Sequence, residues 1–257
     1  QRPNIDYTDT FAPVARMDTV RTVVTISVQK SMCLIQFDVA TAFLNGDIKE
    51  EIYMSPPEGV KVKNSQCLRL NKALYGLKQA PKAWSDKLNS VLESLGLIPT
   101  ISDPCLFINR NKTIYVLIYV DDGMIACKSR REGEELVNNL NKHFRIKQIE
   151  NKLFLGIEFK HIPDGIKLCQ AHYSRTILEK FNLSDAKGRS SVMFDQNKLV
   201  ETDDDLATNA PYRQAVGCLQ YLANTTRPDV LYAVNFLARF NTRPLDKHWE
   251  AIKTVMK

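Results

Sequence analysis

The chain has 257 residues, of which 44% are hydrophobic and 25% are charged, and its net charge is +6. This composition excludes a disordered polymer and a small disulfide-stapled domain, because enough apolar surface is available for a large core. The six cysteines are far apart and none forms a CxxC pair, which excludes a zinc ribbon and favours a reducing compartment. No apolar run approaches the roughly 18 residues of a membrane span, so no membrane partner is expected. The chain begins with Gln1 and ends at Lys257 within a helical pattern, which predicts a piece of a longer protein.

The first part of the chain contains two helical patterns separated by a short strand. Residues 18–30 carry apolar side chains behind an Asp-Thr start that favours a helix, although their β-branched residues leave a strand open. Residues 33–37 are typical of a short buried strand, which brings Asp38 to its end. Within residues 74–97, apolar side chains recur at helical spacing, preceded by Pro81 and stopped by Gly96, which predicts an amphipathic helix.

The middle of the chain is rich in predicted strands and the end is rich in predicted helices. Two apolar runs, 113–120 and 124–127, flank Asp121, Asp122 and Gly123, which predicts a hairpin closed by an Asp-Gly turn. The remaining predictions are a helix over 131–144, a second hairpin over 153–160 and 166–170, and helices over 174–181, 215–225 and 230–240. This order of elements predicts an α+β fold.

Positive charge is concentrated between residues 61 and 90. This stretch contains seven Lys or Arg residues and a single acid, so its charge of +6 equals that of the whole chain. Such a concentration suits a polyphosphate partner, because each neutralised phosphate releases counterions. A solvated lysine-rich face that keeps the protein soluble explains the same pattern, and the residues leave both interpretations open.

Acidic side chains follow the predicted strands at two points. Asp38 ends one strand, and Asp121 and Asp122 occupy the tip of the hairpin, so the three carboxylates converge if these strands are neighbours. Without a partner they would raise one another's pKa, and a hard cation such as Mg²⁺ removes that cost. Two such ions support phosphoryl transfer. Taken alone, the hairpin acids are also typical of an ordinary turn, and Asp38 of a helix cap.

Six segments, in order, resemble the sequence blocks of one family. They are residues 8–16 (TDTFAPVAR), 37–59 (FDVATAFLNGDIKEEIYMSPPEG), 70–84 (LNKALYGLKQAPKAW), 119–122 (YVDD), 154–159 (FLGIEF) and 212–230 (YRQAVGCLQYLANTTRPDV). The chain thereby resembles the reverse transcriptase of copia-class long-terminal-repeat retrotransposons, a part of their Pol polyprotein, over essentially its whole length. A YxDD tetrad alone is weak evidence, whereas six ordered blocks are strong evidence.

The resemblance implies a right-hand polymerase of fingers, palm and thumb, with an antiparallel palm sheet packed on helices. The expected division is 1–35 for part of the fingers and the start of the palm, 36–46 for the palm segment with the first metal ligand, and 47–80 for the fingers. Residues 81–170 are expected to form the palm with the catalytic hairpin and the primer grip, and 171–257 the thumb and the start of the connection. A ribonuclease H domain is expected to be absent from this segment.

The implied activity is RNA-directed DNA polymerisation, in which a primer is extended with dNTPs on an RNA or DNA template by two-metal phosphoryl transfer. Asp38, Asp121 and Asp122 match the catalytic ligands of two Mg²⁺ ions, for which Mn²⁺ is a substitute. The implied partners are the RNA template, the DNA primer, the RNA/DNA hybrid, and other Pol domains, namely integrase upstream and ribonuclease H downstream. The expected location is the cytoplasm, in virus-like particles of the parent element.

Further positions take roles from the resemblance. Phe43 matches a sugar gate whose ring excludes a ribose 2′-hydroxyl, with a plain core phenylalanine as the alternative. Lys147 is the candidate general acid for the leaving pyrophosphate, although residues 145–152 lack the glycine turn more usual in the family. The other positions implied to bind the nucleotide are Arg16, Val39, Ala40, Tyr75, Gly76, Lys78 and Gln79. Those implied to contact primer and template are Pro81, Tyr119, Val120, Phe154, Leu155 and Gly156. For Arg16 and Lys147 a solvated surface cation is the alternative.

Two other functions stay open. One is a catalytically silent fragment of a decayed or domesticated element that binds nucleic acid, against which the intact metal ligands argue. The other is an RNA polymerase of the same hand-like fold. Related RNA polymerases carry an acid at the position of Phe43, so the aromatic ring there favours selection of deoxynucleotides.

Overall fold

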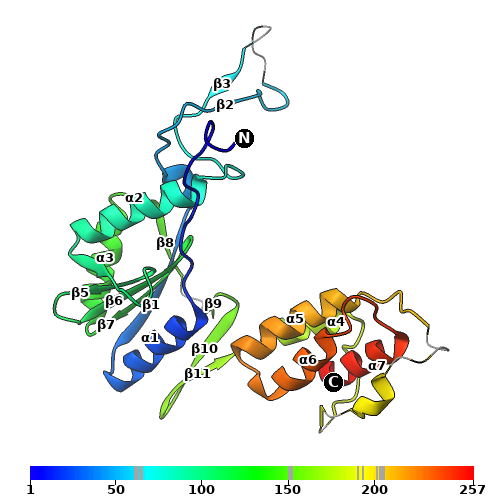
Figure 1. Ribbon diagram of the computed structural model, residues 1–257. Coiled ribbons are helices and arrows are strands. Elements are labelled where there is room, and N and C mark those ends of the chain that lie inside the picture. Colours follow the sequence, from blue (N-terminus) through cyan, green and yellow to red (C-terminus); the bar gives the residue numbers. More distant parts are fainter. Residues whose placement is uncertain are drawn as a thin grey trace. The chain divides into compact units, whose positions relative to one another are not determined.

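The computed structural model describes residues 1–60, 63, 66–149, 153–189, 191–192, 194–200, 202 and 206–257. Lys61 of the basic stretch and residues 150–152 of the segment after Lys147 lie outside these ranges. The chain divides into two compact units, unit 1 (Gln1–Phe154) and unit 2 (Leu155–Lys257). Each unit has its own hydrophobic core. Figure 1 shows the helices and strands of the two units.

A six-stranded antiparallel sheet with the order β4-β5-β6-β7-β1-β8 is the framework of unit 1. Its strands are β1 (Cys33–Val39), β4 (Leu97–Pro99), β5 (Leu106–Asn109), β6 (Ile114–Tyr119), β7 (Asp122–Cys127) and β8 (Ile146–Ile149). The shorter elements of the unit are η1 (Ala42–Asn45), β2 (Tyr53–Met54), β3 (Leu68–Arg69) and β9 (Leu153–Phe154). Because β1 lies between β7 and β8, the strand that ends near Asp38 is the direct neighbour of the hairpin strand.

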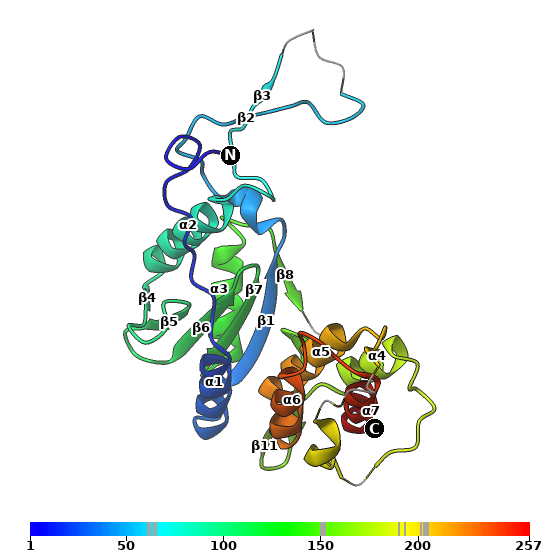
Figure 2. The same ribbon diagram turned by 45° about the vertical axis from the view of Figure 1, so that its right-hand side comes forward.

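Helices cover both faces of this sheet (Figures 1 and 2). Phe37, Trp84 and Leu140 belong to one core, which packs α2 (Ala80–Ser94) and α3 (Arg130–Leu140) against one face. α1 (Met17–Gln29) lies on the other face, where Lys30 donates a hydrogen bond to the Tyr115 hydroxyl of β6 at 3.0 Å. The predicted α+β fold with an antiparallel sheet packed on helices is therefore confirmed.

The helices of unit 1 differ from prediction mainly at their ends. α1 settles the choice between helix and strand for residues 18–30 in favour of the helix. α2 begins at Ala80, next to Pro81, which the sequence places before the helical spacing, whereas Gly76 has a φ of 100° and lies in the chain before the helix. α2 ends before Gly96, as predicted. α3 ends at Leu140, four residues before the predicted end, where a turn brings Phe144 into the core.

The hairpin that carries the paired acids closes one residue earlier than predicted. Tyr119 and Asp122 are register partners, so Val120 and Asp121 form the turn and Gly123 already belongs to β7. The prediction of an Asp-Gly turn was therefore wrong. The physical reason is that Gly123 is needed inside the strand: a Cβ atom there would lie 2.1 Å from the ring of Phe37.

Unit 2 combines a hairpin with a small helical bundle. The hairpin strands are β10 (Ile157–Ile162) and β11 (Gly165–Cys169), which confirms the second predicted hairpin. The helices are α4 (Ala171–Lys180), η2 (Gln196–Leu199), α5 (Tyr212–Thr225), η3 (Pro228–Val230), α6 (Leu231–Ala238) and α7 (Asp246–Met256). The three helices predicted here are confirmed, and α7 accounts for the helical pattern at the end of the sequence. Across the described ranges of both units, none of the helices combines the length and apolarity needed to cross a membrane.

The close approach of Gly123 to Phe37 makes a testable prediction about stability. Gly123→Ala is expected to lower the free energy of unfolding by about 1–3 kcal/mol, because the added methyl group overlaps a buried ring. Gly217→Ala on α5 is the matched control, since a Cβ atom at Gly217 meets no atom within 4 Å. This control is expected to gain up to about 1 kcal/mol from helix propensity. Urea denaturation of both variants measures the difference, and equal stabilities would contradict the proposed packing.

Candidate active site

Four side chains form a row across the sheet of unit 1. Register pairs Tyr119 of β6 with Asp122 of β7, Asp122 with Asp38 of β1, and Asp38 with Lys147 of β8. Directly opposite residues of an antiparallel sheet project to the same face, so these four side chains share one face. Phe37 points into the core beneath α2 and α3. Since side chains alternate along a strand, its neighbour Asp38 and the rest of these four side chains lie on the opposite face of the sheet. We call Tyr119, Asp122, Asp38 and Lys147 the cross-strand row.

Strand pairing brings the acids of β1 and the hairpin close together. The Val39 N–H donates to the Asp121 carbonyl at 2.8 Å, so Val39 and Asp121 form a hydrogen-bonded pair. Because such pairs alternate along an antiparallel ladder, Asp38 and Asp122 form a non-hydrogen-bonded pair, whose Cα atoms lie about 4.5 Å apart. Asp121 precedes Asp122 in the turn. The structure therefore brings together the three acids that the sequence suggested would converge.

The electrostatics of this site favour a cationic partner. Burial raises the pKa of Asp122, and the negative charges of Asp121 and Asp38 raise it further. An oxygen-only donor set that repels itself fits a hard divalent cation such as Mg²⁺. Within the described ranges, however, no three His, Cys, Asp or Glu side chains are already arranged to hold one metal ion. The backbone thus brings the donors together, and binding would require their side chains to turn towards a common point.

Trp84 supports the turn of the hairpin from the core side. Its indole Nε1 donates to the Val120 carbonyl at 2.7 Å, and its ring packs edge-on against Phe144 at 5.0 Å. Val120 has a φ of 57°, which is unusual for a β-branched residue. From the sequence alone, Trp84 is one apolar residue of a predicted helix. The missed signal was its buried indole N–H, which needs an acceptor.

The candidate nucleotide-binding residues near β1 fall into two groups, Val39 with Ala40 at the end of the strand and Phe43 with Tyr75 beyond it. Val39 is buried in the core, and Ala40 continues the strand, its N–H donating to the Arg145 carbonyl at 2.9 Å. Phe43 lies in η1, and its ring is 4.6 Å from that of Tyr75, centroid to centroid. The structure therefore brings together the candidate sugar gate and Tyr75, which is 54% exposed.

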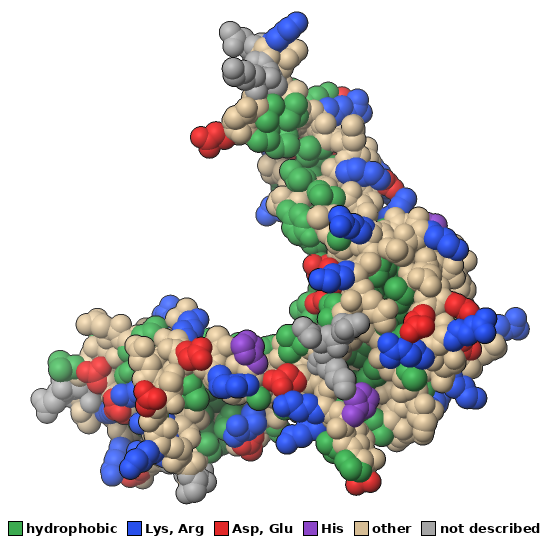
Figure 3. Space-filling view, turned by 180° about the vertical axis from the view of Figure 1, so that it is seen from behind, with side chains coloured by type: hydrophobic (Ala, Val, Ile, Leu, Met, Phe, Trp, Pro, Cys, Tyr) green, Lys and Arg blue, Asp and Glu red, His purple; other side chains and the backbone are tan. Residues whose placement is uncertain are grey.

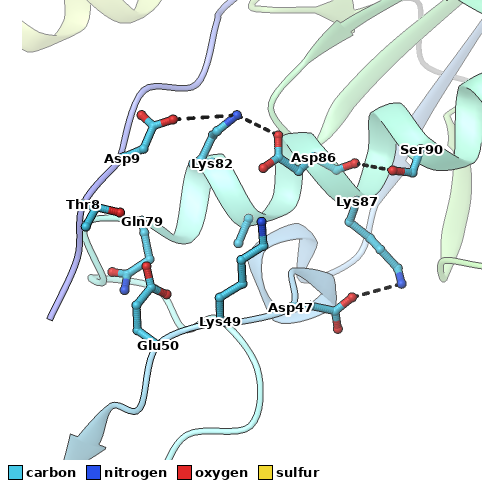
Figure 4. Close-up of a pocket in the computed structure, with 11 residues that line it drawn as sticks. Thr8, Asp9, Asp47, Lys49, Glu50, Gln79, Lys82, Asp86, Lys87 and Ser90 are labelled. Atoms are coloured by element: carbon cyan, nitrogen blue, oxygen red, sulfur yellow. Dashed lines mark hydrogen bonds and ion pairs between the residues drawn. The ribbon is translucent and has the colours of Figure 1, made fainter.

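Gln79 is engaged within the protein rather than offered to a ligand. Its side chain is 3% exposed and accepts a hydrogen bond from Gln1 Nε2 at 2.8 Å. Its own amide donates to the Asp6 carbonyl at 2.9 Å. The neighbouring Lys78 has an exposed side chain, while its N–H donates to Gln1 Oε1 at 2.8 Å. In this structure Gln79 secures the N-terminal segment and lines the polar pocket of Figure 4, and its nucleotide-binding role stays a prediction.

Asp103 is a buried acid that the sequence analysis missed, and it accounts for the position of Arg16. Its carboxylate accepts hydrogen bonds from the Arg16 N–H, the Thr19 hydroxyl and the Cys105 N–H. Arg16 is the N-cap residue of α1, and an arginine side chain carries no acceptor, so Asp103 supplies the cap from a distant loop. Burial opposes ionisation of Asp103, but these hydrogen bonds outweigh it and lower the pKa. The Arg16 guanidinium donates to the Ser102 carbonyl and so holds the same loop.

The candidate primer and template residues are divided between the units. Pro81 lies in the first turn of α2, and Phe154 is buried at the end of unit 1. In unit 2, the Leu155 carbonyl accepts a hydrogen bond from the Tyr221 hydroxyl, and a Cβ atom on Gly156 would lie 3.2 Å from that hydroxyl. The structure thus assigns Tyr221 a supporting role that the sequence analysis did not identify.

The basic stretch of residues 61–90 is largely paired with acids. Figure 4 shows a polar pocket of 440 Å³ in which Lys82 bridges Asp86 at 2.8 Å and Asp9 at 4.0 Å. In the same pocket Lys87 contacts Asp47 at 3.1 Å. The remaining pairs are Lys72 with Asp47 and Arg69 with Glu51. On the face seen in Figure 3, Lys and Arg side chains are likewise interspersed with Asp and Glu. This pairing weakens the interpretation of residues 61–90 as one polyphosphate-binding patch.

Comparisons with known proteins agree with the motifs of the sequence. The profile of the family described as reverse transcriptase (RNA-dependent DNA polymerase) matches residues 1–194. The Retrovirus-related Pol polyprotein from transposon RE2 of Arabidopsis thaliana is 40% identical over the whole chain, which covers 18% of that protein. The corresponding polyprotein from transposon TNT 1-94 of Nicotiana tabacum is 37% identical, and the chain covers 20% of it. The Putative transposon Ty5-1 protein of Saccharomyces cerevisiae is 31% identical over 86% of the chain and 74% of its own length. The chain therefore spans about a fifth of the two plant polyproteins.

The cap that Asp103 provides for α1 predicts that the stability of the protein depends on pH. The pKa of Asp103 is lower in the folded state than its ordinary value of 3.8. At pH values above 3.8 the ionised carboxylate therefore stabilises the fold. This contribution is lost as the pH falls through the pKa of Asp103 in the folded state. Asp103→Asn is expected to cost about 1–3 kcal/mol at about pH 7. The difference from the unaltered protein should shrink at about pH 3.

Urea denaturation at both pH values measures this effect. The matched control is Asp18→Asn, an exposed acid in the first turn of the same helix, which is expected to cost at most about 1 kcal/mol. A loss at Asp103 that is equal at both pH values would contradict the role of the ionised carboxylate.

Proposed function

The chain belongs to the reverse transcriptase (RNA-dependent DNA polymerase) family, as its motifs predict, and we propose that it is the RNA-directed DNA polymerase core of a copia-type retrotransposon. It extends a DNA primer with dNTPs on an RNA or DNA template. The observation that carries the proposal is the cross-strand row, in which Asp38 and Asp122 face each other on paired strands beside Asp121. Three acids in that arrangement are suited to phosphoryl transfer and serve no evident structural purpose.

In the proposed reaction the primer 3′-hydroxyl oxygen attacks the α-phosphorus of the dNTP, and the bond to pyrophosphate breaks. Asp38, Asp121 and Asp122 would hold two Mg²⁺ ions, or Mn²⁺ in their stead. Bound divalent ions supply activation of the attacking oxygen and neutralisation of charge on the leaving group. The register of β1 against β7 orients the carboxylates, and the hydrogen bond from Trp84 fixes the turn that carries Asp121.

Lys147 is proposed as the proton donor of this reaction. Its register position opposite Asp38 supports the role, because both side chains project to the same face of the sheet. The Nζ atom would hold a proton and give it to the leaving pyrophosphate oxygen. Lys147 is also exposed, as a group that meets a substrate must be.

We further propose that the two units follow the hand-like division implied by the family. The six-stranded sheet would form the palm, residues 47–80 part of the fingers, and residues 171–257 the thumb and the start of the connection. In this scheme primer or template contacts are assigned to Pro81, Tyr119, Val120, Leu155 and Gly156. Phe154 is 2% exposed, so its side chain would support this region by packing. Support comes from the antiparallel sheet with helices on both faces and from the separate helical bundle.

The natural context is proposed from the relatives. Their names describe Pol polyproteins, so we propose that this chain works beside an integrase upstream and a ribonuclease H downstream. Its nucleic acid partners would be an RNA template and the RNA/DNA hybrid that it generates. Assembly in cytoplasmic virus-like particles of the parent element is part of the same proposal.

A primer-extension assay on poly(rA)/oligo(dT) with Mg²⁺ tests the function. The protein is expected to incorporate dTTP, and Asp121→Asn is expected to reduce the rate by roughly 100-fold or more, because a carboxylate is lost where charge must be neutralised. Asp164→Asn, in the exposed turn of the β10–β11 hairpin, is the matched control and is expected to retain the rate.

The same assay distinguishes the alternative function. Well-folded protein that binds the template–primer at low salt but incorporates no dTTP would favour a catalytically silent nucleic-acid-binding fragment. Equal loss in Asp121→Asn and Asp164→Asn would show that the Asp121 carboxylate has no special role in the reaction.

The contact between Phe43 and Tyr75 leads to a prediction about sugar selection. If the Phe43 ring blocks a ribose 2′-hydroxyl, Phe43→Ala should lower the preference for dNTP over rNTP by roughly 10- to 100-fold. Phe43→Tyr keeps the ring and its contact with Tyr75, so its preference should stay close to that of the unaltered enzyme. The ratio of kcat/KM for dTTP and UTP measures the effect, and an unchanged ratio in Phe43→Ala would remove the gate assignment.

A further inference from the structure

An apolar cavity of 520 Å³ lies on the α2 side of the sheet in unit 1. Its walls come from five parts of the chain: residues 10–14, Phe43 of η1, α2, β5 with the loop before it, and the end of β6 with the turn that follows. Among the described residues that line it, none carries a charge. The polar pocket of Figure 4 is different, because most of its lining residues are acids or lysines.

The floor of this cavity is a packed core and its rim is open. Trp84, Leu88 and Phe107 form the floor and are at most 3% exposed. Phe11 and Val14 stand at the rim and are 75% and 48% exposed. The floor is thus preformed, while the rim presents apolar surface that a ligand would remove from water, which favours binding.

The polar groups of the cavity are neutral. The indole N–H of Trp84 is already bonded to the Val120 carbonyl. Burial raises the pKa of the Cys105 thiol to about 12, so the thiol stays protonated and is a poor nucleophile. The other polar lining residues are Thr10, Ser85 and Asn89. A charged ligand would therefore lose its hydration without meeting an opposite charge.

We propose that this cavity binds an uncharged, largely aromatic small molecule of two or three rings, on the side of the sheet opposite the cross-strand row. The volume falls within the range of about 300–1,000 Å³ that is usual for small-molecule sites. A polyphosphate chain does not suit a lining without cations. Phe43, Pro81 and Val120 line the cavity and are also implied to contact nucleotide, primer or template. The inference goes beyond the proposed polymerase function and is tested independently of it, since binding can be measured without turnover.

The ligand would touch the support of the candidate active site. Trp84 and Val120 both line the cavity, and the hydrogen bond between them fixes the turn that carries Asp121. A bound molecule therefore rests against the core side of this turn, while the carboxylates of Asp38 and Asp122 project from the other face.

Fluorescence with the uncharged naphthalene dye Prodan tests the site. The chain has two tryptophans, so the full-length Trp249→Phe variant leaves Trp84 as the single energy donor. Saturable binding is expected, with a blue shift of the dye emission and energy transfer from Trp84. A dye that binds without transfer from Trp84, or without saturation, would overturn the proposal.

Substitutions at the rim and on α2 locate the bound dye. Phe11→Asp introduces a charge at an exposed position and should raise the Kd at least tenfold. Ile101→Asp is the matched control, because Ile101 is a fully exposed apolar residue of unit 1 outside the cavity, and its Kd should stay within twofold. Ser85→Phe fills the cavity from α2 and should also raise the Kd at least tenfold. Equal affinity in all three variants would overturn the proposal.

Other occupants are outcomes of the same measurement. Displacement of the dye by an oligo(dT) strand would assign the cavity to nucleic acid instead. Loss of dye binding at protein concentrations where light scattering detects a dimer would assign it to a second copy of the chain. Dye binding that is unaffected by oligo(dT) and independent of protein concentration supports the small-molecule site.

Discussion

The pairing of β1 with β7 is the interaction on which the candidate site depends. Side chains alternate along a strand, so a slip of one residue would turn Asp38 into the core and Phe37 out of it. The register is secured by the Phe37 ring, which is 1% exposed and occupies the space that a side chain on Gly123 would need. The apolar face of the sheet thereby determines which carboxylates meet on the other face.

The same pairing creates a cost that only function explains. Asp38 and Asp122 lie opposite each other, and Asp121 is next in the turn, so repulsion and burial together disfavour the charged form of Asp122. Val120 lies beside these acids and has a positive φ. This backbone conformation costs a β-branched residue roughly 1–3 kcal/mol. The hydrogen bond from Trp84 and the core around it hold this arrangement in position. Electrostatic repulsion and backbone strain are thus concentrated at one turn, as is typical of functional sites.

Local sequence patterns predicted most helices and strands. Features that depend on residues far apart in the chain, such as the turn register and the cap of α1, could not be predicted from the sequence. The helix at α1 and the two hairpins followed from periodicity and turn residues, which are local properties. The turn register depended on Phe37, which is far from Gly123 along the chain. The cap that Asp103 provides for Arg16 joins residues 87 positions apart, and the bond between Gln1 and Gln79 spans 78. The net charge of residues 61–90 follows directly from the sequence. The acids that form ion pairs with the lysines and arginines of this stretch come partly from elsewhere in the chain.

The turn that carries Asp121 is shared by the two faces of the sheet, and this sharing has a thermodynamic consequence. Ions held by the carboxylates, as proposed, would favour one geometry of the turn from one face. A molecule in the apolar cavity contacts Val120 and Trp84 and favours one geometry from the other face. If both prefer the same geometry, each increases the affinity of the other by the same factor, and if they prefer different geometries each decreases it equally. The sign of this coupling is set by whether the Trp84–Val120 hydrogen bond survives occupation of the cavity.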